Sequence, residues 1–128
     1  MILDAGVLVS LDRREPAANM FIKTTDEDDV ALHTSEAVIA QVWRDGARQA
    51  RLAAFLKTVE IHPLDDGRAV GRVLRDSGTS DVVDAHLGLL AEELDDDILT
   101  GDVDDLRRVV AALSRPVVVL PWPPAPRS

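Results

Sequence analysis

Short apolar runs alternate with longer amphipathic stretches along this chain, and this alternation constrains the fold more than any other feature of the sequence. Parallel strands need crossover connections, which are usually helices, so alternating strand-length and helix-length segments predict an α/β protein. We expect a three-layer α/β/α architecture around a central parallel sheet of about five strands. The expected strands are Met1–Leu3, Val30–His33, Val59–His62, Asp97–Thr100 and Val117–Leu120.

Residues that favour helix ends divide the segments between these strands. Pro16 suits the first turn of a helix, and Gly78 suits the position after the last turn. Ser35 and Ser80 can each cap a helix, whereas Asp26–Asp29 is expected to be an acidic loop. The first expected helix begins at Pro16, and the others cover about residues 36–44, 47–56, 66–77, 81–93 and 102–113. We expect one domain over residues 1–120, followed by a proline-rich tail over 121–128.

Composition limits the possible functions. The chain carries 23 acidic and 14 basic residues, a net charge of −9, and no cysteine. This charge argues against bulk electrostatic binding of nucleic acid and makes a basic protein partner plausible. The absence of cysteine excludes thiolate chemistry and agrees with a cytoplasmic location. No apolar stretch approaches the roughly 18–20 residues of a membrane span, so we expect no membrane association.

Acidic residues follow the first and fourth expected strands and also begin the helix that precedes the fourth strand. Asp4 comes directly after the first strand, and Asp102 and Asp105 follow the fourth. Asp81 and Asp84 begin the preceding helix with the same spacing, which puts each pair on one helical face. Because chemistry in open α/β sheets gathers beyond the carboxyl ends of the strands, these carboxylates are candidates for a shared site.

A cation would make such a cluster stable. Two unit charges about 4 Å apart repel by roughly 4 kcal/mol at an effective dielectric constant near 20. Oxygen-only ligation suits Mg²⁺ or Mn²⁺, which can activate water and stabilise charge on a phosphodiester. Acids at helix starts are also common as capping residues, so each pair by itself has a structural explanation.

Three segments together resemble the PIN-domain ribonucleases of the VapC toxin type. Residues 1–6, Met-Ile-Leu-Asp-Ala-Gly, are similar to the opening strand of that family with its first acid, Asp4. Residues 84–91, Asp-Ala-His-Leu-Gly-Leu-Leu-Ala, resemble its Asp-Ala helix, with Asp84 as the third acid. Residues 98–106 resemble its Thr-x-Asp-x-x-Asp segment, which supplies Asp102 and Asp105. The resemblance extends from Met1 to about Leu120.

Two positions depart from the family pattern. Gly6 stands where the family usually has Ser or Thr, and Gln41 stands where it has its second acid, a Glu. Gln keeps a carbonyl oxygen that can ligate a metal but lacks the charge. Glu36 lies five residues away and off that helical face, whereas Asp81, one turn before Asp84, can compensate.

The resemblance implies an Mg²⁺- or Mn²⁺-dependent endoribonuclease. In that interpretation Asp4, Asp84, Asp102 and Asp105 are catalytic and hold the metal, with Gln41 and Asp81 as further candidates. It also implies an RNA substrate, a cognate antitoxin and a homodimer. The alternative is a PIN-fold binding or regulatory protein that has lost catalysis, which Gln41 and Gly6 motivate. A phospho-acceptor domain is disfavoured because Ala5–Val9 supplies no second acid.

The remaining polar candidates carry less information. Arg44, Arg48 and Arg51 lie close to Gln41 in the sequence and are candidates for contact with an RNA backbone. The three histidines are scattered and lack the spacing of metal ligands, so packing is their expected role: His33, His62 and His86.

Overall fold

The computed structural model describes residues 1–124 as five short strands and seven helices. All strand pairs are parallel, and the order across the sheet is β3-β2-β1-β4-β5. The expected five-stranded parallel sheet is therefore confirmed. The strands are β1 (Ile2–Leu3), β2 (His33–Ser35), β3 (Glu60–His62), β4 (Ile98–Thr100) and β5 (Val119–Pro121).

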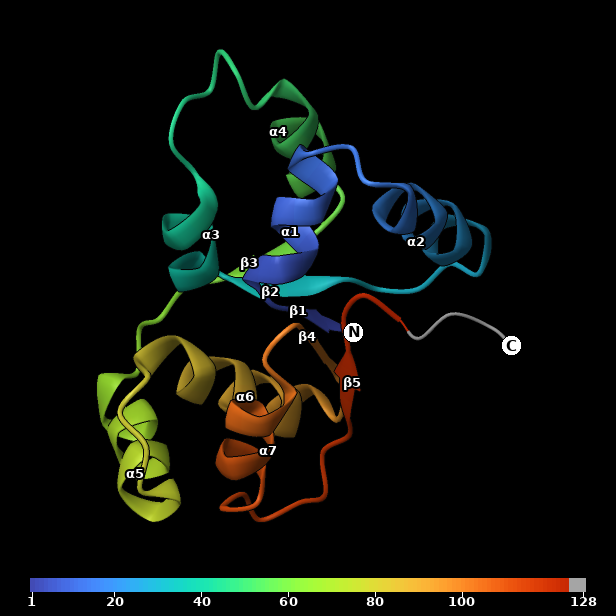
Figure 1. The fold of residues 1–128 in the computed structure, drawn as a ribbon. Helices are drawn as coiled ribbons and strands as arrows, with labels where there is room; N and C mark the ends of the chain where they lie inside the picture. Colours follow the sequence, from blue (N-terminus) through green and yellow to red (C-terminus); the bar gives the residue numbers. More distant parts are fainter. Residues whose placement is uncertain (125–128) are drawn as a thin grey trace.

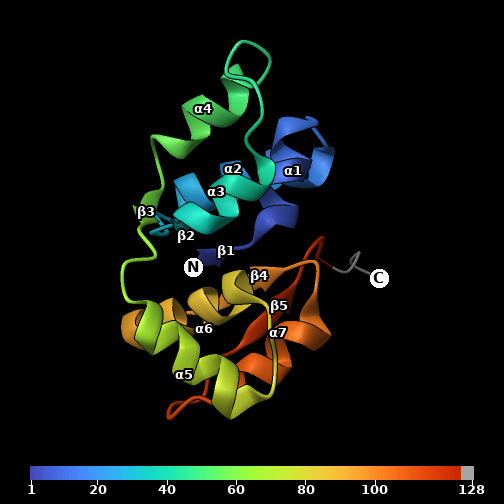
Figure 2. The ribbon, with the colours of Figure 1, turned by 90° about the vertical axis from the view of Figure 1, so that its left-hand side faces the viewer.

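Helices cover both faces of the sheet, which gives the expected three layers. Figures 1 and 2 show helices on both sides of the sheet. The upper layer contains α1 (Ala5–Asp12), α2 (Pro16–Glu27), α3 (Glu36–Val42) and α4 (Ala50–Leu56). The lower layer contains α5 (Gly67–Ser77), α6 (Val82–Leu94) and α7 (Val103–Val110). None of the helices within residues 1–124 is long and apolar enough to cross a membrane.

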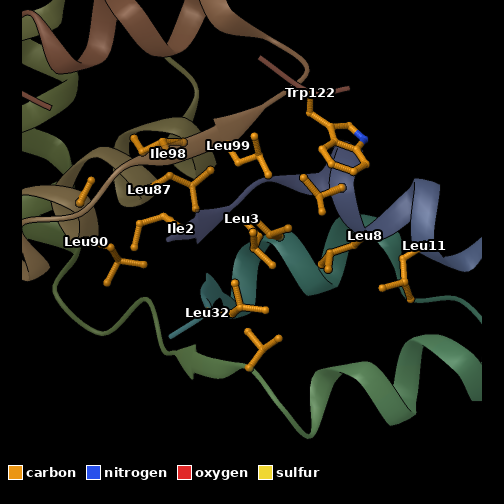
Figure 3. Packing of buried hydrophobic residues seen from close by; sticks show 14 of the residues in the cluster. Ile2, Leu3, Leu8, Leu11, Leu32, Leu87, Leu90, Ile98, Leu99 and Trp122 are labelled. Carbon is orange, nitrogen blue, oxygen red and sulfur yellow. The ribbon is translucent and has the colours of Figure 1, made fainter. Parts of the chain in front are cut away.

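The core is centred on β1, the middle strand. Ile2 and Leu3 are both fully buried, because successive side chains of a strand point to opposite faces and both faces are covered by helices. Figure 3 shows the side chains of β1 and β4 among leucines of α1 and α6. A strand with apolar residues on both sides is the pattern expected for a parallel sheet between two helical layers.

Capping residues explain several helix ends. Ser35 Oγ accepts a hydrogen bond from the N–H of Ala37 at 3.0 Å, and Gly78 ends α5 with a φ of 66°. Both were expected from the sequence. The cap of α6 is Asp81 rather than Ser80, because Asp81 Oδ1 accepts the N–H of Asp84 at 3.0 Å.

Helix α1 was not expected, because its sequence is apolar nearly all round and carries no helical periodicity. It begins at once after β1, where Asp4 serves as its cap.

The second strand begins later in the sequence than expected. The helix α2 runs to Glu27 and Asp29 adopts a φ of 52° after it, so the strand begins at His33 rather than Val30.

The segment between α3 and α4 differs from the expected helix start at residue 47. The buried side chain of Gln49 accepts hydrogen bonds from the N–H groups of Arg44 and Asp45 at 2.7 and 3.0 Å. Its amide nitrogen donates to the carbonyl oxygen of Val42 at 2.9 Å. These bonds satisfy the backbone of a compact turn, and α4 therefore begins only at Ala50.

The fold includes residues beyond Leu120. Pro121 belongs to β5, an edge strand in which a missing N–H is tolerated. Trp122 is buried, donates from Nε1 to Ser10 Oγ at 2.9 Å, and packs edge-on against Phe21 with ring centroids 5.5 Å apart. Two residues of the expected tail, Pro121 and Trp122, therefore contact the rest of the fold, and its positions 125–128 lie outside the described residues.

Candidate functional site

Two neighbouring strands carry the first part of the site. Because β1 pairs with β4, Asp4 at the end of β1 lies next to Thr100 at the end of β4. Thr100 Oγ1 donates to Asp4 Oδ2 at 2.6 Å and accepts the N–H of Asp102 at 2.9 Å. Asp4 and Thr100 are both buried. One hydroxyl therefore fixes both the carboxylate of Asp4 and the start of the segment that leads into α7.

Helices α6 and α7 supply the rest. Asp84, Asp102 and Asp105 each place a carboxylate oxygen within 4.8 Å of the others. Asp84 is buried in the first turn of α6, whereas Asp102 and Asp105 are exposed or half-exposed at the start of α7. The structure therefore brings together these three expected site residues, and Asp4 is close enough to perturb both Asp84 and Asp102. We call these four residues the acidic cluster.

The acidic cluster is short of positive charge. Burial, together with the negative charges of Asp81, Asp4 and the two α7 acids, raises the pKa of Asp84 to about 7. The pKa of Asp102 is also raised, first by its side-chain hydrogen bond with Asp105. In the described part of the chain, the basic group paired with the cluster is Arg108, whose Nη1 lies 3.7 Å from Asp105 Oδ1. Carboxylate oxygens with excess negative charge are a donor set that fits Mg²⁺ or Mn²⁺.

An open cavity of about 380 Å³ lies beside the cluster. Its walls include Asp81, Asp84 and Asp105 together with Arg108. Sequence reasoning did not single out Arg108, although its position three residues after Asp105 places it next to that acid on the surface of α7. The cavity therefore combines carboxylates with one guanidinium group, which suits a ligand that carries both a metal and an anionic group.

The two further metal-ligand candidates occupy different environments. Asp81 lines the cavity, although its Oδ1 is engaged in capping α6. Gln41 is exposed in the last turn of α3, and no side-chain hydrogen bond joins it to the acidic cluster within residues 1–124.

The three arginine candidates do not share one helical face. Arg44 is exposed after α3 and bonds its own helix end, with Nη1 2.6 Å from the carbonyl oxygen of Trp43. Arg48 is exposed in the turn before α4 and pairs with Asp45 at 3.7 Å. Arg51 lies in α4, donates to Asn19 Oδ1, and lines a separate cavity of about 440 Å³.

Two of the histidines are not scattered as the sequence suggested. His33 and His62 lie side by side on β2 and β3, with Glu60 next to them. The register of the parallel strands β2 and β3 could have revealed this pair, because it places their residues opposite each other. The spacing of the two histidines in the sequence resembles no metal-binding motif. His86 has a different hydrogen-bond partner, since its Nδ1 lies 2.6 Å from Ser35 Oγ.

Close packing of α6 against α7 holds two acids in place. A Cβ at Gly88 would lie 2.7 Å from Val109 Cγ1, a distance that real Cβ atoms do not show. Gly88 follows Asp84 by one helical turn, and Val109 follows Asp105 by the same interval. The contact between α6 and α7 therefore lies one helical turn after the two carboxylates, Asp84 and Asp105.

No protein-family model matches the chain, and no match to it was found among curated proteins. The resemblance to PIN-domain ribonucleases therefore remains a prediction, carried by the sequence segments and by the acids that they place.

Proposed function

We propose that this protein is an Mg²⁺- or Mn²⁺-dependent endoribonuclease of the PIN-domain type. The observation that carries the proposal is the approach of Asp84, Asp102 and Asp105 to within 4.8 Å, beside Asp4. Carboxylates at this separation repel one another, and this repulsion adds to the effect of burial in raising the pKa of Asp84. A divalent cation would remove this repulsion, and the four residues of the acidic cluster would hold it.

The roles of the individual residues follow from their contacts. A bound Mg²⁺ or Mn²⁺ supplies a water molecule of lowered pKa and neutralises charge on the phosphodiester. Thr100 keeps Asp4 Oδ2 in one orientation through its 2.6 Å hydrogen bond. Arg108, on the wall of the same cavity, can pair with an RNA phosphate once the acids are neutralised.

The net charge of −9 fits a local rather than a diffuse mode of RNA binding. Repulsion of RNA by the protein as a whole requires that affinity come from the metal and from single basic groups such as Arg108. The same charge favours a basic protein partner. On the resemblance to the VapC toxins we propose that this partner is a cognate antitoxin, and that the protein is a cytoplasmic homodimer.

The experiment that tests the proposal is cleavage of a mixed pool of structured RNAs by the purified protein with Mn²⁺, Mg²⁺ or EDTA. We expect cleavage with either metal and none with EDTA. Asp105→Asn should lose about 100-fold or more of the rate, because it removes a metal ligand. Asp104→Asn is the matched control, since Asp104 is an exposed acid on the same helix outside the cluster.

A non-catalytic binding protein is the second candidate, and the exposed Gln41 favours it because no charge stands at the family's Glu position. This candidate predicts that wild-type protein and Asp105→Asn are equally inert with every metal. It also predicts that Mn²⁺ does not raise the melting temperature. Both results together would remove the nuclease proposal.

A further inference from the structure

A second group of possible ligands lies on the adjacent strands β2 and β3. In the parallel register His33 is opposite Glu60, and Ser35 is opposite His62. Residues two apart on a strand point to the same face, so His33, Glu60 and His62 share one face of the sheet. A ligand atom of each lies within 4.8 Å of the other two. We call these three residues the histidine cluster.

The distances within the histidine cluster match those around a small divalent ion. His33 Nδ1 lies 3.0 Å from His62 Nε2 and 3.3 Å from Glu60 Oε2, and His62 Nε2 lies 3.9 Å from Glu60 Oε1. Zinc bonds to imidazole and carboxylate are about 2.0–2.2 Å long, so neighbouring donors of a tetrahedral zinc lie roughly 3.3–3.5 Å apart. One ion can therefore contact all three groups after shifts of a few tenths of an ångström.

The chemistry of the donors also separates this group from the acidic cluster. Two imidazoles and one carboxylate suit Zn²⁺ and similar transition metals, whereas the acidic cluster offers only oxygen. The histidines are largely shielded from water, but the side chain of Glu60 is 67% exposed, so an ion can enter from solvent. His62 also borders a cavity of about 170 Å³.

We propose that His33, Glu60 and His62 form a second metal site that binds one Zn²⁺-class ion, with a remaining position open to water. Its position suggests a structural effect. β3 is an edge strand of only three residues, and two of the ligands belong to it. An ion bound to the histidine cluster therefore ties β3 to β2 through side chains in addition to the backbone ladder, and stabilises the folded state by mass action.

The competing explanation is a hydrogen-bonded histidine pair without metal. A separation of 3.0 Å between His33 Nδ1 and His62 Nε2 also permits an N–H···N hydrogen bond, in which one ring carries the proton. A bound metal and this shared proton exclude each other, since both need the same two nitrogen lone pairs. The two explanations therefore predict different ring-nitrogen states when Zn²⁺ is added.

Imidazole ¹⁵N spectra of the whole protein test the proposal, because the chain contains only three histidines. The measurement uses the Asp84→Asn/Asp105→Asn variant, so that the acidic cluster cannot compete for the ion. One equivalent of Zn²⁺ should move His33 Nδ1 and His62 Nε2 to shifts typical of metal-bound nitrogen. His86, whose Nδ1 is hydrogen-bonded with Ser35 Oγ, should not reach the shifts of metal-bound nitrogen. Unchanged shifts of His33 and His62 would overturn the proposal.

Calorimetric titration with Zn²⁺ in the same background gives an independent result. Glu60→Gln should weaken binding about 100-fold or more, because even indirect partners of a ligand contribute 10–100-fold. Glu60 is exposed, so this variant should fold normally. Glu93→Gln is the matched control, since Glu93 is an exposed acid that lines the small cavity beside His62 but is not part of the histidine cluster. Equal affinity for Glu60→Gln and the control would also overturn the proposal.

Discussion

Thr100 and Asp4 are 96 positions apart in the chain, and the Thr100 hydroxyl donates a 2.6 Å hydrogen bond to Asp4 Oδ2. The same hydroxyl accepts the backbone N–H of Asp102. The Thr100 hydroxyl therefore connects Asp4, at the end of β1, to the segment that leads into α7 and carries Asp102 and Asp105. A fully buried hydroxyl with partners on both sides has no alternative water partner, so its loss should be felt in stability and in the site together.

Thr100→Val keeps the shape of the side chain and removes both hydrogen bonds. We expect the free energy of unfolding to fall by about 1–3 kcal/mol, measured by urea denaturation. Mn²⁺ affinity should also fall, because Asp4 loses the partner that orients it. Thr34→Val is the matched control, since Thr34 is equally buried but donates to the carbonyl oxygen of Leu3. Equal Mn²⁺ affinity in the two variants would contradict this account of Thr100.

The raised pKa of Asp84 predicts an unusual pH dependence of metal-free stability. Asp84 titrates near 3.8 when unfolded and at about 7 when folded. Between these values the unfolded state binds fewer protons than the folded state, so the contribution of Asp84 to the free energy of unfolding falls as pH rises from about 4 to 7. Above about pH 7 that contribution stays at its lower value.

Asp84→Asn should remove this contribution. At pH 8 in EDTA we expect the variant to be more stable than wild type, on the order of 2–4 kcal/mol, and at pH 4 the two should be nearly equal. Thermal unfolding across this pH range measures the difference, with Asp104→Asn as the control that keeps the wild-type slope. Parallel curves for wild type and Asp84→Asn would show that Asp84 titrates normally.

Arg108 is expected to act on the substrate rather than on the metal. If the protein cleaves RNA, Arg108→Ala should raise KM about tenfold, which corresponds to the loss of one charged contact. Mn²⁺ affinity should stay the same or increase, because a cation is removed beside Asp105. Arg107→Ala alters the preceding exposed arginine of α7 and should leave both quantities unchanged. A fall in Mn²⁺ affinity for Arg108→Ala would refute this division of roles.

Gln41→Glu tests whether residue 41, where the PIN-domain pattern has its second acid, can contribute to the metal site. We expect the added carboxylate to tighten Mn²⁺ binding, measured by calorimetry, and to increase RNA cleavage if α3 presents this position to the site. Glu36→Gln changes an exposed charge at the other end of α3 and should leave Mn²⁺ affinity unchanged. No gain in Gln41→Glu would place residue 41 outside the metal site.

Gly88→Ala should destabilise the protein, although alanine favours helices by about 1 kcal/mol over glycine. The new methyl would meet Val109, whose branched side chain is stiff and buried. We expect a net loss of about 1–3 kcal/mol in urea denaturation. Combining it with Val109→Ala should recover part of that loss, so the two changes should be non-additive.

The alternation of apolar runs with helical stretches was enough to predict the α/β class and the five parallel strands. Parallel strands need crossover connections, and the helices in these connections cover both faces of the sheet. The same signal failed for α1. A helix packed between the sheet and other helices is apolar on most sides, so Val7, Leu8 and Leu11 show no amphipathic period. The start of α4 was displaced for another reason, because the side chain of Gln49 replaces backbone partners in the turn before it.

The candidate site was partly predictable for a related reason. Asp4, Asp102 and Asp105 follow strands whose carboxyl ends must meet if the strands are neighbours, and the structure makes β1 and β4 neighbours. The pairing of His33 with His62 depends on strand register and is not visible in one-dimensional spacing, since 29 positions separate the two histidines. Arg108 lies three residues after Asp105, so its approach to that acid follows from helical spacing once α7 is known.

The central place of β1 has a consequence for how this molecule opens. β1 pairs with β2 on one side and with β4 on the other, and the N–H of Asp4 donates to the carbonyl oxygen of Leu99. These residues can separate from the sheet only when partners some 30 and 96 positions away also separate. We therefore expect β1 to belong to the slowest-exchanging part of the fold and Asp4, which directly follows it, to be held there for as long as the sheet stays intact.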